Sequence, residues 1–98
     1  MSNNGQIMQK RWSFPDAPNT AVITTARVAH KNKAILGVIH QAGWQFLDGE
    51  DVAASDAVVV ALRELIQKDA SLELLADLPE GWQAWRKTPG SPWQRSPL

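Results

Sequence analysis

The sequence predicts an α+β fold: a small antiparallel sheet of three to four strands with one main helix and one short helix packed on one face. Two observations predict it. Segments rich in β-branched and aromatic residues fill the first half of the chain, and such residues favour strands. After Gly49 the spacing of the apolar residues changes from two to about 3.6, the period of a helix. Strands followed by helices, without regular alternation, are typical of α+β folds.

The length of the chain limits it to one domain. Its 98 residues suffice for one modest core and not for two. We predict a disordered N-terminal tail over residues 1–11, a single α+β domain over residues 12–93 and a C-terminal tail over residues 94–98. Trp12 and Phe14 lie two positions apart, so both rings face one side of a short extended segment where the domain begins.

Three strands are expected in the first half of the chain. Residues 21–28 are dense in β-branched side chains, and residues 34–40 form a nearly continuous apolar run that suits a strand covered on both faces. Residues 44–47 form the third strand, which Asp48 and Gly49 end with turn chemistry. With Asn32 as the turn residue best suited to a left-handed conformation, the three strands predict an antiparallel meander.

The second half of the chain predicts two helices. The main helix carries apolar residues at helical spacing, namely Val58, Ala61, Leu62, Leu65 and Ile66. Ser55 or Asp51 is suited to cap its N-terminus. A short second helix is expected over residues 69–78, with Ser71 as its cap. Its core-facing side chains are Leu72, Leu75 and Leu78.

Residues 82–87 predict a fourth strand, in which alternation puts Trp82 and Trp85 on opposite faces of the sheet. From Thr88 onward, prolines and a glycine disfavour regular structure. Trp93 is nevertheless able to pack back onto the fold.

Composition and charge exclude several classes of function. The net charge is zero, which gives no overall attraction to nucleic acid or to anionic lipid. No apolar stretch approaches the roughly 20 residues of a membrane-spanning helix, and the N-terminus has no secretory h-region. Cysteine is absent, which excludes disulfides and thiolate metal sites. We therefore expect a cytoplasmic protein whose partners include neither nucleic acid nor a membrane.

No motif in the sequence carries catalytic chemistry. His30 and His40 lack the spacing of metal ligands, and neither a phosphate-binding loop nor an activated nucleophile is present. Asp48, Glu50 and Asp51 form the tightest carboxylate group, but turns and helix N-termini already favour acids at such a position. We therefore predict a protein that is not an enzyme and requires no metal or cofactor.

The five tryptophans are the unusual feature of the composition, and each needs either a core or a partner to cover it. Trp44, beside Phe46, favours the core, whereas one of Trp82 and Trp85 is a candidate contact with a partner. Acidic residues also gather between Asp48 and Glu80, in contrast to the basic flanks. The candidate partner-binding residues are Trp44, Asp48, Glu50, Asp51, Asp56, Trp82, Trp85 and Arg86.

Several motifs carry a family resemblance. They are an apolar strand ending in His40, the run Trp44-Gln45-Phe46-Leu47-Asp48-Gly49, the segment Asp69-Ala70-Ser71-Leu72, the run Leu78-Pro79-Glu80-Gly81-Trp82-Gln83-Ala84-Trp85-Arg86, and Pro92-Trp93. The chain resembles, over residues 12–93, a family of small bacterial proteins defined as a domain of unknown function and grouped with polymorphic-toxin immunity proteins of class thirty-three. The resemblance implies an α+β domain that in some cases neutralises a secreted toxin by binding it. It carries over no catalytic residue, and the acidic spacer of many relatives before Trp44 is replaced here by Gln41-Ala42-Gly43.

Three hypotheses of function stay open at this point. The first is a binding module of the immunity kind, in which an acidic face between Asp48 and Asp56 and an exposed tryptophan occlude a basic surface of a cognate protein toxin. The second is a small-molecule or peptide binder with a pocket between helix and sheet, lined by Trp44, Trp82 and His40. The third is a homo-oligomeric interaction domain. The expected oligomeric state is accordingly a monomer or a homodimer.

Overall fold

The computed structural model describes residues 12–51 and 53–98, so the tail predicted over residues 1–11 lies outside it. The strands are β1 (Ala21–Thr25), β2 (Gly37–His40), β3 (Trp44–Leu47), β4 (Ala57–Ala61), β5 (Trp82–Trp85) and β6 (Gln94–Pro97). The α-helices are α2 (Ala26–Lys31) and α3 (Leu62–Lys68), and the 3-10 segments are η1 (Ala54–Asp56) and η2 (Ala70–Leu75). The α+β class is confirmed.

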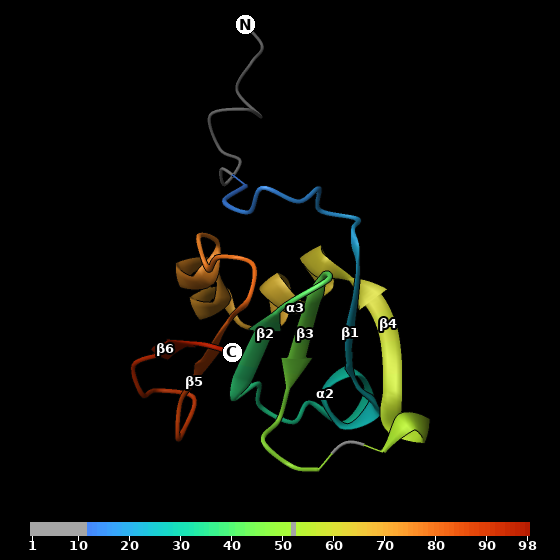
Figure 1. The fold of residues 1–98 in the computed structure, drawn as a ribbon. Helices are drawn as coiled ribbons and strands as arrows, with labels where there is room; N and C mark the ends of the chain where they lie inside the picture. Colours follow the sequence, from blue (N-terminus) through green and yellow to red (C-terminus); the bar gives the residue numbers. More distant parts are fainter. Residues whose placement is uncertain (1–11, 52) are drawn as a thin grey trace, which may run out of the picture.

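The strands form one 6-stranded sheet in the order β4-β1-β3-β2-β5-β6. This is more than the three to four strands that the sequence predicts. In Figure 1 the helix α3 lies behind the sheet, and the leucines of η2 join the same core. The opposite face of the sheet, turned toward the viewer, has no helix over it in the described part of the chain.

The sheet is mixed, so the prediction of a purely antiparallel meander is wrong. The strand β1 pairs with β3 in parallel, with Ile23 opposite Gln45, whereas β2 and β3 form an antiparallel hairpin. The cause lies at Thr25, whose hydroxyl accepts a hydrogen bond from the Val28 amide at 3.1 Å and caps α2 directly after β1. The end of the first predicted strand is therefore helical. The chain then enters β2 on the far side of β3.

The left-handed conformation predicted for Asn32 is confirmed, with a φ of 55°. Its role differs from the one we expected, because Asn32 ends a helix rather than a hairpin. In that position its backbone amide donates to the Arg27 carbonyl. Asparagine tolerates this conformation better than most residues, which explains both the prediction and the cap.

Residues 57–61 form the edge strand β4, where we expected the first turns of the main helix. Val58 and Val60 pair with residues of β1 along the whole strand. Their branched side chains lose rotamer freedom in a helix and pack well on a pleated surface. The helix α3 begins after Ala61, which makes no side-chain cap bond, so Ser55 and Asp51 do not cap it.

The predicted core residues of the short second helix are confirmed, whereas the predicted cap, Ser71, is wrong. Leu72, Leu75 and Leu78 are buried as predicted. The segment η2 is a 3-10 helix capped by Asp69, whose carboxylate accepts from the Ser71 amide at 3.0 Å. Aspartate at this position leaves Ser71 inside the first turn.

The end of the chain contains a strand that the sequence does not predict. Residues 94–97 pair with β5 in antiparallel register, with Trp85 opposite Gln94. A turn in which the Ser91 amide donates to the Thr88 carbonyl at 3.0 Å reverses the chain before it. Proline is tolerated there because β6 is an edge strand. The segment that we expected to be a C-terminal tail thus belongs to the domain.

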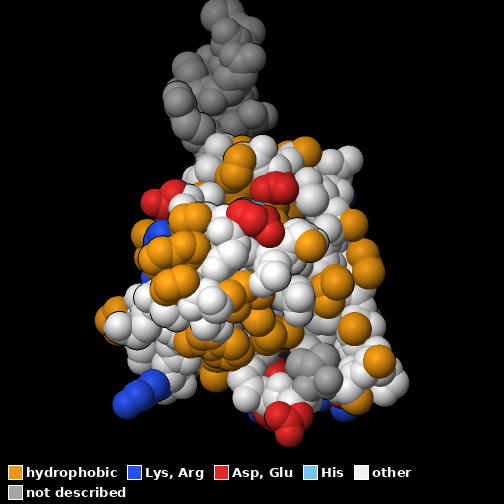
Figure 2. Space-filling view, in the orientation of Figure 1, with side chains coloured by type: hydrophobic (Ala, Val, Ile, Leu, Met, Phe, Trp, Pro, Cys, Tyr) orange, Lys and Arg blue, Asp and Glu red, His pale blue; other side chains and the backbone are white. Residues whose placement is uncertain are grey.

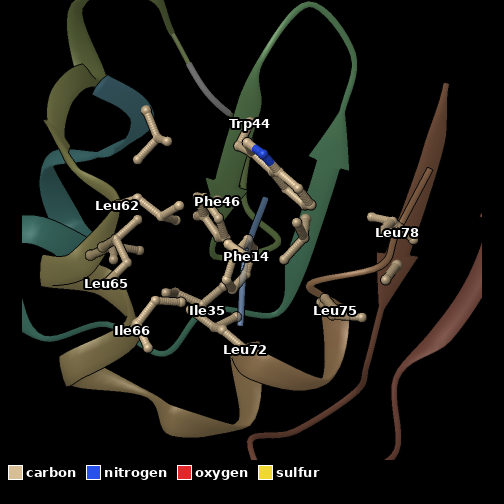
Figure 3. Packing of buried hydrophobic residues seen from close by; sticks show 14 residues of the cluster. Phe14, Ile35, Trp44, Phe46, Leu62, Leu65, Ile66, Leu72, Leu75 and Leu78 are labelled. Atoms are coloured by element: carbon tan, nitrogen blue, oxygen red, sulfur yellow. The ribbon is translucent and has the colours of Figure 1, made fainter. Parts of the chain in front are cut away.

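The hydrophobic core lies between the sheet and the helices (Figure 3). Leu62, Leu65 and Ile66 of α3 point toward Phe46 at the centre of the sheet. Phe14, from the segment before β1, packs edge-on against Trp44 with ring centroids 5.2 Å apart. Phe14 and Trp44 therefore close one end of the core.

Candidate functional site

The face of the sheet opposite α3 is the candidate functional site. Side chains alternate along each strand, so this open face carries Ile23, Ile39, Gln45, Leu47, Val59, Gln83 and Trp85. Ile23 is 41% exposed and Val59 is 68% exposed, although both are apolar. In Figure 2, which looks onto this face, hydrophobic side chains spread over the sheet and charged groups lie toward its rim.

Five residues of the open face stand in one continuous cross-strand row, and Leu47, Gly37 and Trp85 form the row beside it. Val59 lies opposite Ile23, and Ile23 lies opposite Gln45. Gln45 in turn faces Ile39, which faces Gln83 on β5. The row therefore mixes apolar side chains with two amides and contains no formal charge. Such a surface suits contact with a protein better than binding of an ion.

Trp85 is the largest side chain of the open face, and its ring packs on the backbone of Gly37. Gly37 lies opposite Trp85 in the register of β2 and β5. A Cβ atom added to Gly37 would lie 2.1 Å from Cζ3 of the Trp85 ring, so the ring rests directly on the glycine backbone. The indole Nε1 donates to Gln83 Oε1 at 2.8 Å. The ring is thus held flat on the sheet and stays partly exposed.

Trp82 lies on the other face of the sheet, which confirms the prediction that the two tryptophans of β5 point in opposite directions. Trp82 is half-buried and packs against the hydrophobic core. Trp85 is therefore the tryptophan of this pair that faces away from the core. The sequence reduces the choice to two residues, and the sheet register decides between them.

Trp44, Asp48 and Arg86 are buried, so these three predicted contact residues are covered within the fold. Arg86 donates two hydrogen bonds to the Ile35 carbonyl, at 2.8 and 3.1 Å, and one to the Asp69 carboxylate at 2.5 Å. The ring of Trp93 lies 4.1 Å from its guanidinium carbon, so Trp93 does pack back onto the fold. Arg86 joins η2, β5 and the last turn of the chain.

The acidic segment is largely bound by basic side chains. Arg27 contacts Asp48 at 2.6 Å and Asp56 at 3.4 Å. Lys33 contacts Glu50 at 2.8 Å. The Arg27 guanidinium holds the pKa of Asp48 below its ordinary value. The segment therefore carries less unpaired negative charge than its sequence suggests, with Glu50 and Asp51 as its exposed carboxylates.

His40 and Trp44, which the second hypothesis places in the lining of a pocket, pack against each other and against neighbouring groups. Their rings are stacked with centroids 3.8 Å apart, and Nδ1 of His40 lies 2.7 Å from the Leu78 carbonyl. Phe14 also packs edge-on against Trp44. These groups pack against one another and hold the hairpin onto the core.

Ile23, Val59 and Gly37 belong to the site, yet sequence reasoning did not single them out. Their exposure depends on which face the helices cover, and this is decided by long-range packing. One local signal was present, because a glycine inside an apolar strand often marks a close approach of another group. Among the described residues, no three histidine or carboxylate side chains converge as metal ligands do.

Comparison with known proteins gives no relative: no family model, no curated protein and no solved structure matches the chain. None of the helices in the described ranges has the length and apolar character needed to cross a bilayer. The chemistry of the site therefore rests on the residues themselves.

Proposed function

We propose that this domain acts by binding another protein through the open face of its sheet, with Trp85 as the central anchor. One observation carries the proposal: a partly exposed indole is held flat over Gly37, beside the uncharged row that runs from Val59 to Gln83. Because the ring is already fixed, it loses little conformational freedom on binding. Tryptophan is also the residue type most enriched at binding hot spots.

The amides of the open face add specificity to this contact. Gln45 and Gln83 lie in the row with Ile23 and Ile39. An amide offers both donors and an acceptor, so a partner loop or strand is able to pair with it. A protein surface with apolar side chains and complementary hydrogen-bonding groups fits this pattern.

The biological role that we propose is neutralisation of a toxin by occlusion, in a bacterial cytoplasm. The support is the resemblance of the motifs to the immunity family, together with a surface suited to binding. The loop between β3 and η1 runs along one end of the sheet (Figure 1). The exposed carboxylate of Asp51 is placed to steer a basic partner toward the neighbouring open face.

The experiment is affinity capture from the native host with the wild-type protein and with Trp85→Ala. The matched control is Leu74→Ala, because Leu74 is an exposed apolar residue, 68% exposed, on η2. We expect one protein to be retained by the wild type and by Leu74→Ala and to be lost with Trp85→Ala. Expression of that protein alone should inhibit growth, and co-expression of the domain should restore it. If Trp85→Ala still retained the protein, Trp85 would not be the central contact residue.

A further inference from the structure

The outer edge of β4 is the second surface that lacks a partner in the described part of the chain. The strand ends the sheet on one side (Figure 1). It carries five small or apolar residues and no charge. The opposite edge strand, β6, contains Arg95 and Pro97, which are residues that protect an edge against pairing. The two edges of the sheet therefore differ in kind.

The pairing of β4 with β1 determines which backbone groups point outward. In an antiparallel pair, residues that bond to the neighbouring strand alternate with residues that face away from it. The Leu62 amide donates to the Thr20 carbonyl at 2.9 Å, so the even-numbered residues of β4 bond toward β1. The residues that face outward are Ala57, Val59 and Ala61.

Two of the outward groups already have partners. The Ala57 amide donates to the Ala54 carbonyl. The Ala61 carbonyl, at the N-cap of α3, accepts the first bond of that helix. The groups left over are the Ala57 carbonyl, both groups of Val59 and the Ala61 amide. If a second copy lies antiparallel with its Val59 opposite this Val59, each free donor of this set faces a free acceptor of the other copy.

We propose that two copies of this chain associate by antiparallel pairing of their β4 strands about a two-fold axis at Val59. Val59 then exchanges two hydrogen bonds with Val59 of the second copy. The Ala61 amide of each copy donates to the Ala57 carbonyl of the other. The two sheets join into one, and both open faces lie on the same side of it.

The side chains of β4 fit the same arrangement. The strand reads Ala-Val-Val-Val-Ala in both directions, so every residue opposes one of its own kind. Branched residues opposite one another stabilise a sheet. Asp56 and Arg63 flank the strand in η1 and α3, so no charged side chain lies within the paired segment.

Sedimentation velocity of the full chain from about 10 μM to about 1 mM tests the proposal. We expect a reversible monomer–dimer equilibrium for the wild type. Val59→Lys places two like charges at the two-fold axis and should weaken the dimer about tenfold or more. Val59→Pro removes the outward amide and should act in the same direction, while the ladder to β1 is kept. Circular dichroism of both variants shows whether each is folded, so that a weaker dimer is distinguished from an unfolded chain.

The matched control is Leu74→Lys, since Leu74 and Val59 are both 68% exposed. We expect this variant and Trp85→Ala to dimerise like the wild type, which separates this edge from the open face around Trp85. A wild type that stays monomeric over the whole range would overturn the proposal. So would a Val59→Lys variant that dimerises as strongly as the wild type.

A single introduced cysteine tests the register, because the chain has none of its own. The proposed axis puts the two residues at position 59 opposite each other, with Cβ atoms about 5 Å apart. The two residues at position 23 lie about 14 Å apart, across three inter-strand spacings. A short thiol cross-linker should therefore join Val59→Cys and not Ile23→Cys. The reverse pattern would contradict β4 pairing.

Discussion

Arg86 is the residue that does most to hold the C-terminal part of the domain in place. Its guanidinium bonds to the Ile35 carbonyl, to Ser71, to Asp69 and to the Pro89 carbonyl. A buried charge is expensive unless every donor is paired, and here the planar fork meets acceptors from three parts of the chain. The sequence identifies Arg86 as a basic residue among aromatics. Its burial follows from long-range contacts that no local pattern encodes.

We predict that Arg86→Lys lowers the free energy of unfolding by about 3 kcal/mol. A lysine ammonium has three donors on a flexible stem and leaves several of these acceptors unpaired. Urea denaturation followed by tryptophan fluorescence provides the measurement. Arg95→Lys is the control, because Arg95 pairs with the exposed Asp77 at 2.6 Å and should change stability little. Equal losses for the two variants would contradict the assigned role.

Asp48 should make the stability of the domain depend on pH in the acid range. Arg27 holds its pKa below the ordinary value of 3.8. A carboxyl group with a depressed pKa in the folded state stabilises the fold above its unfolded pKa, and this contribution is lost as the pH falls through the folded pKa. We therefore expect the free energy of unfolding to decline below about pH 4, and Asp48→Asn to make that decline shallower.

Urea denaturation at several values between about pH 6 and about pH 2 measures this slope. Asp51→Asn serves as the matched control, because Asp51 lies in the same loop with an exposed side chain. If Asp51→Asn flattens the decline as much as Asp48→Asn, the ion pair with Arg27 is not its cause.

At the scale of elements, the predictions succeed where local pattern and tertiary context agree. The strands β3 and β5 and the buried leucines of η2 follow from alternation and spacing. The strand β4 does not, because Val58 and Ala61 also fit the helical stripe of the residues that follow, and only the long-range pairing with β1 decides for a strand. The helix α2 has six residues, and its start depends on one hydroxyl.

That hydroxyl allows a direct test. We expect Thr25→Val to lower the free energy of unfolding by about 1 kcal/mol, because the Val28 amide loses its cap. Thr25→Ser keeps the acceptor and should stay closer to the wild type. Thermal unfolding followed by circular dichroism distinguishes the two variants. A valine variant as stable as the serine variant would contradict the capping role.

The packing of the Trp85 ring on Gly37 joins two neighbouring strands, β5 and β2. Gly37→Ala puts a Cβ atom where the ring now lies, so we expect a loss of about 1 to 3 kcal/mol in the free energy of unfolding. In the background of Trp85→Ala the same change should cost much less, because the clash is gone. Urea denaturation of the two single variants and the double variant gives the coupling. Additive effects would contradict the contact.

At the scale of the whole molecule, the order of the strands decides which residues are available to a partner. Because β1 pairs with β4 on one side and with β3 on the other, Ile23 lies between Val59 and Gln45 on the open face. No local signal encodes that pairing, so the sequence predicts a tryptophan-centred surface without locating it. The acidic segment illustrates the same limit, since its partners Arg27, in α2, and Lys33, just after that helix, are distant from it in the sequence.

Titration calorimetry of the captured partner against wild type, Trp85→Ala and Leu74→Ala measures how much the Trp85 side chain contributes to binding. We expect Trp85→Ala to weaken binding by about 2 kcal/mol or more, as for a hot-spot tryptophan, and Leu74→Ala to bind like the wild type. Unchanged affinity for Trp85→Ala, or an equal loss for Leu74→Ala, would contradict the assignment of the open face as the binding surface.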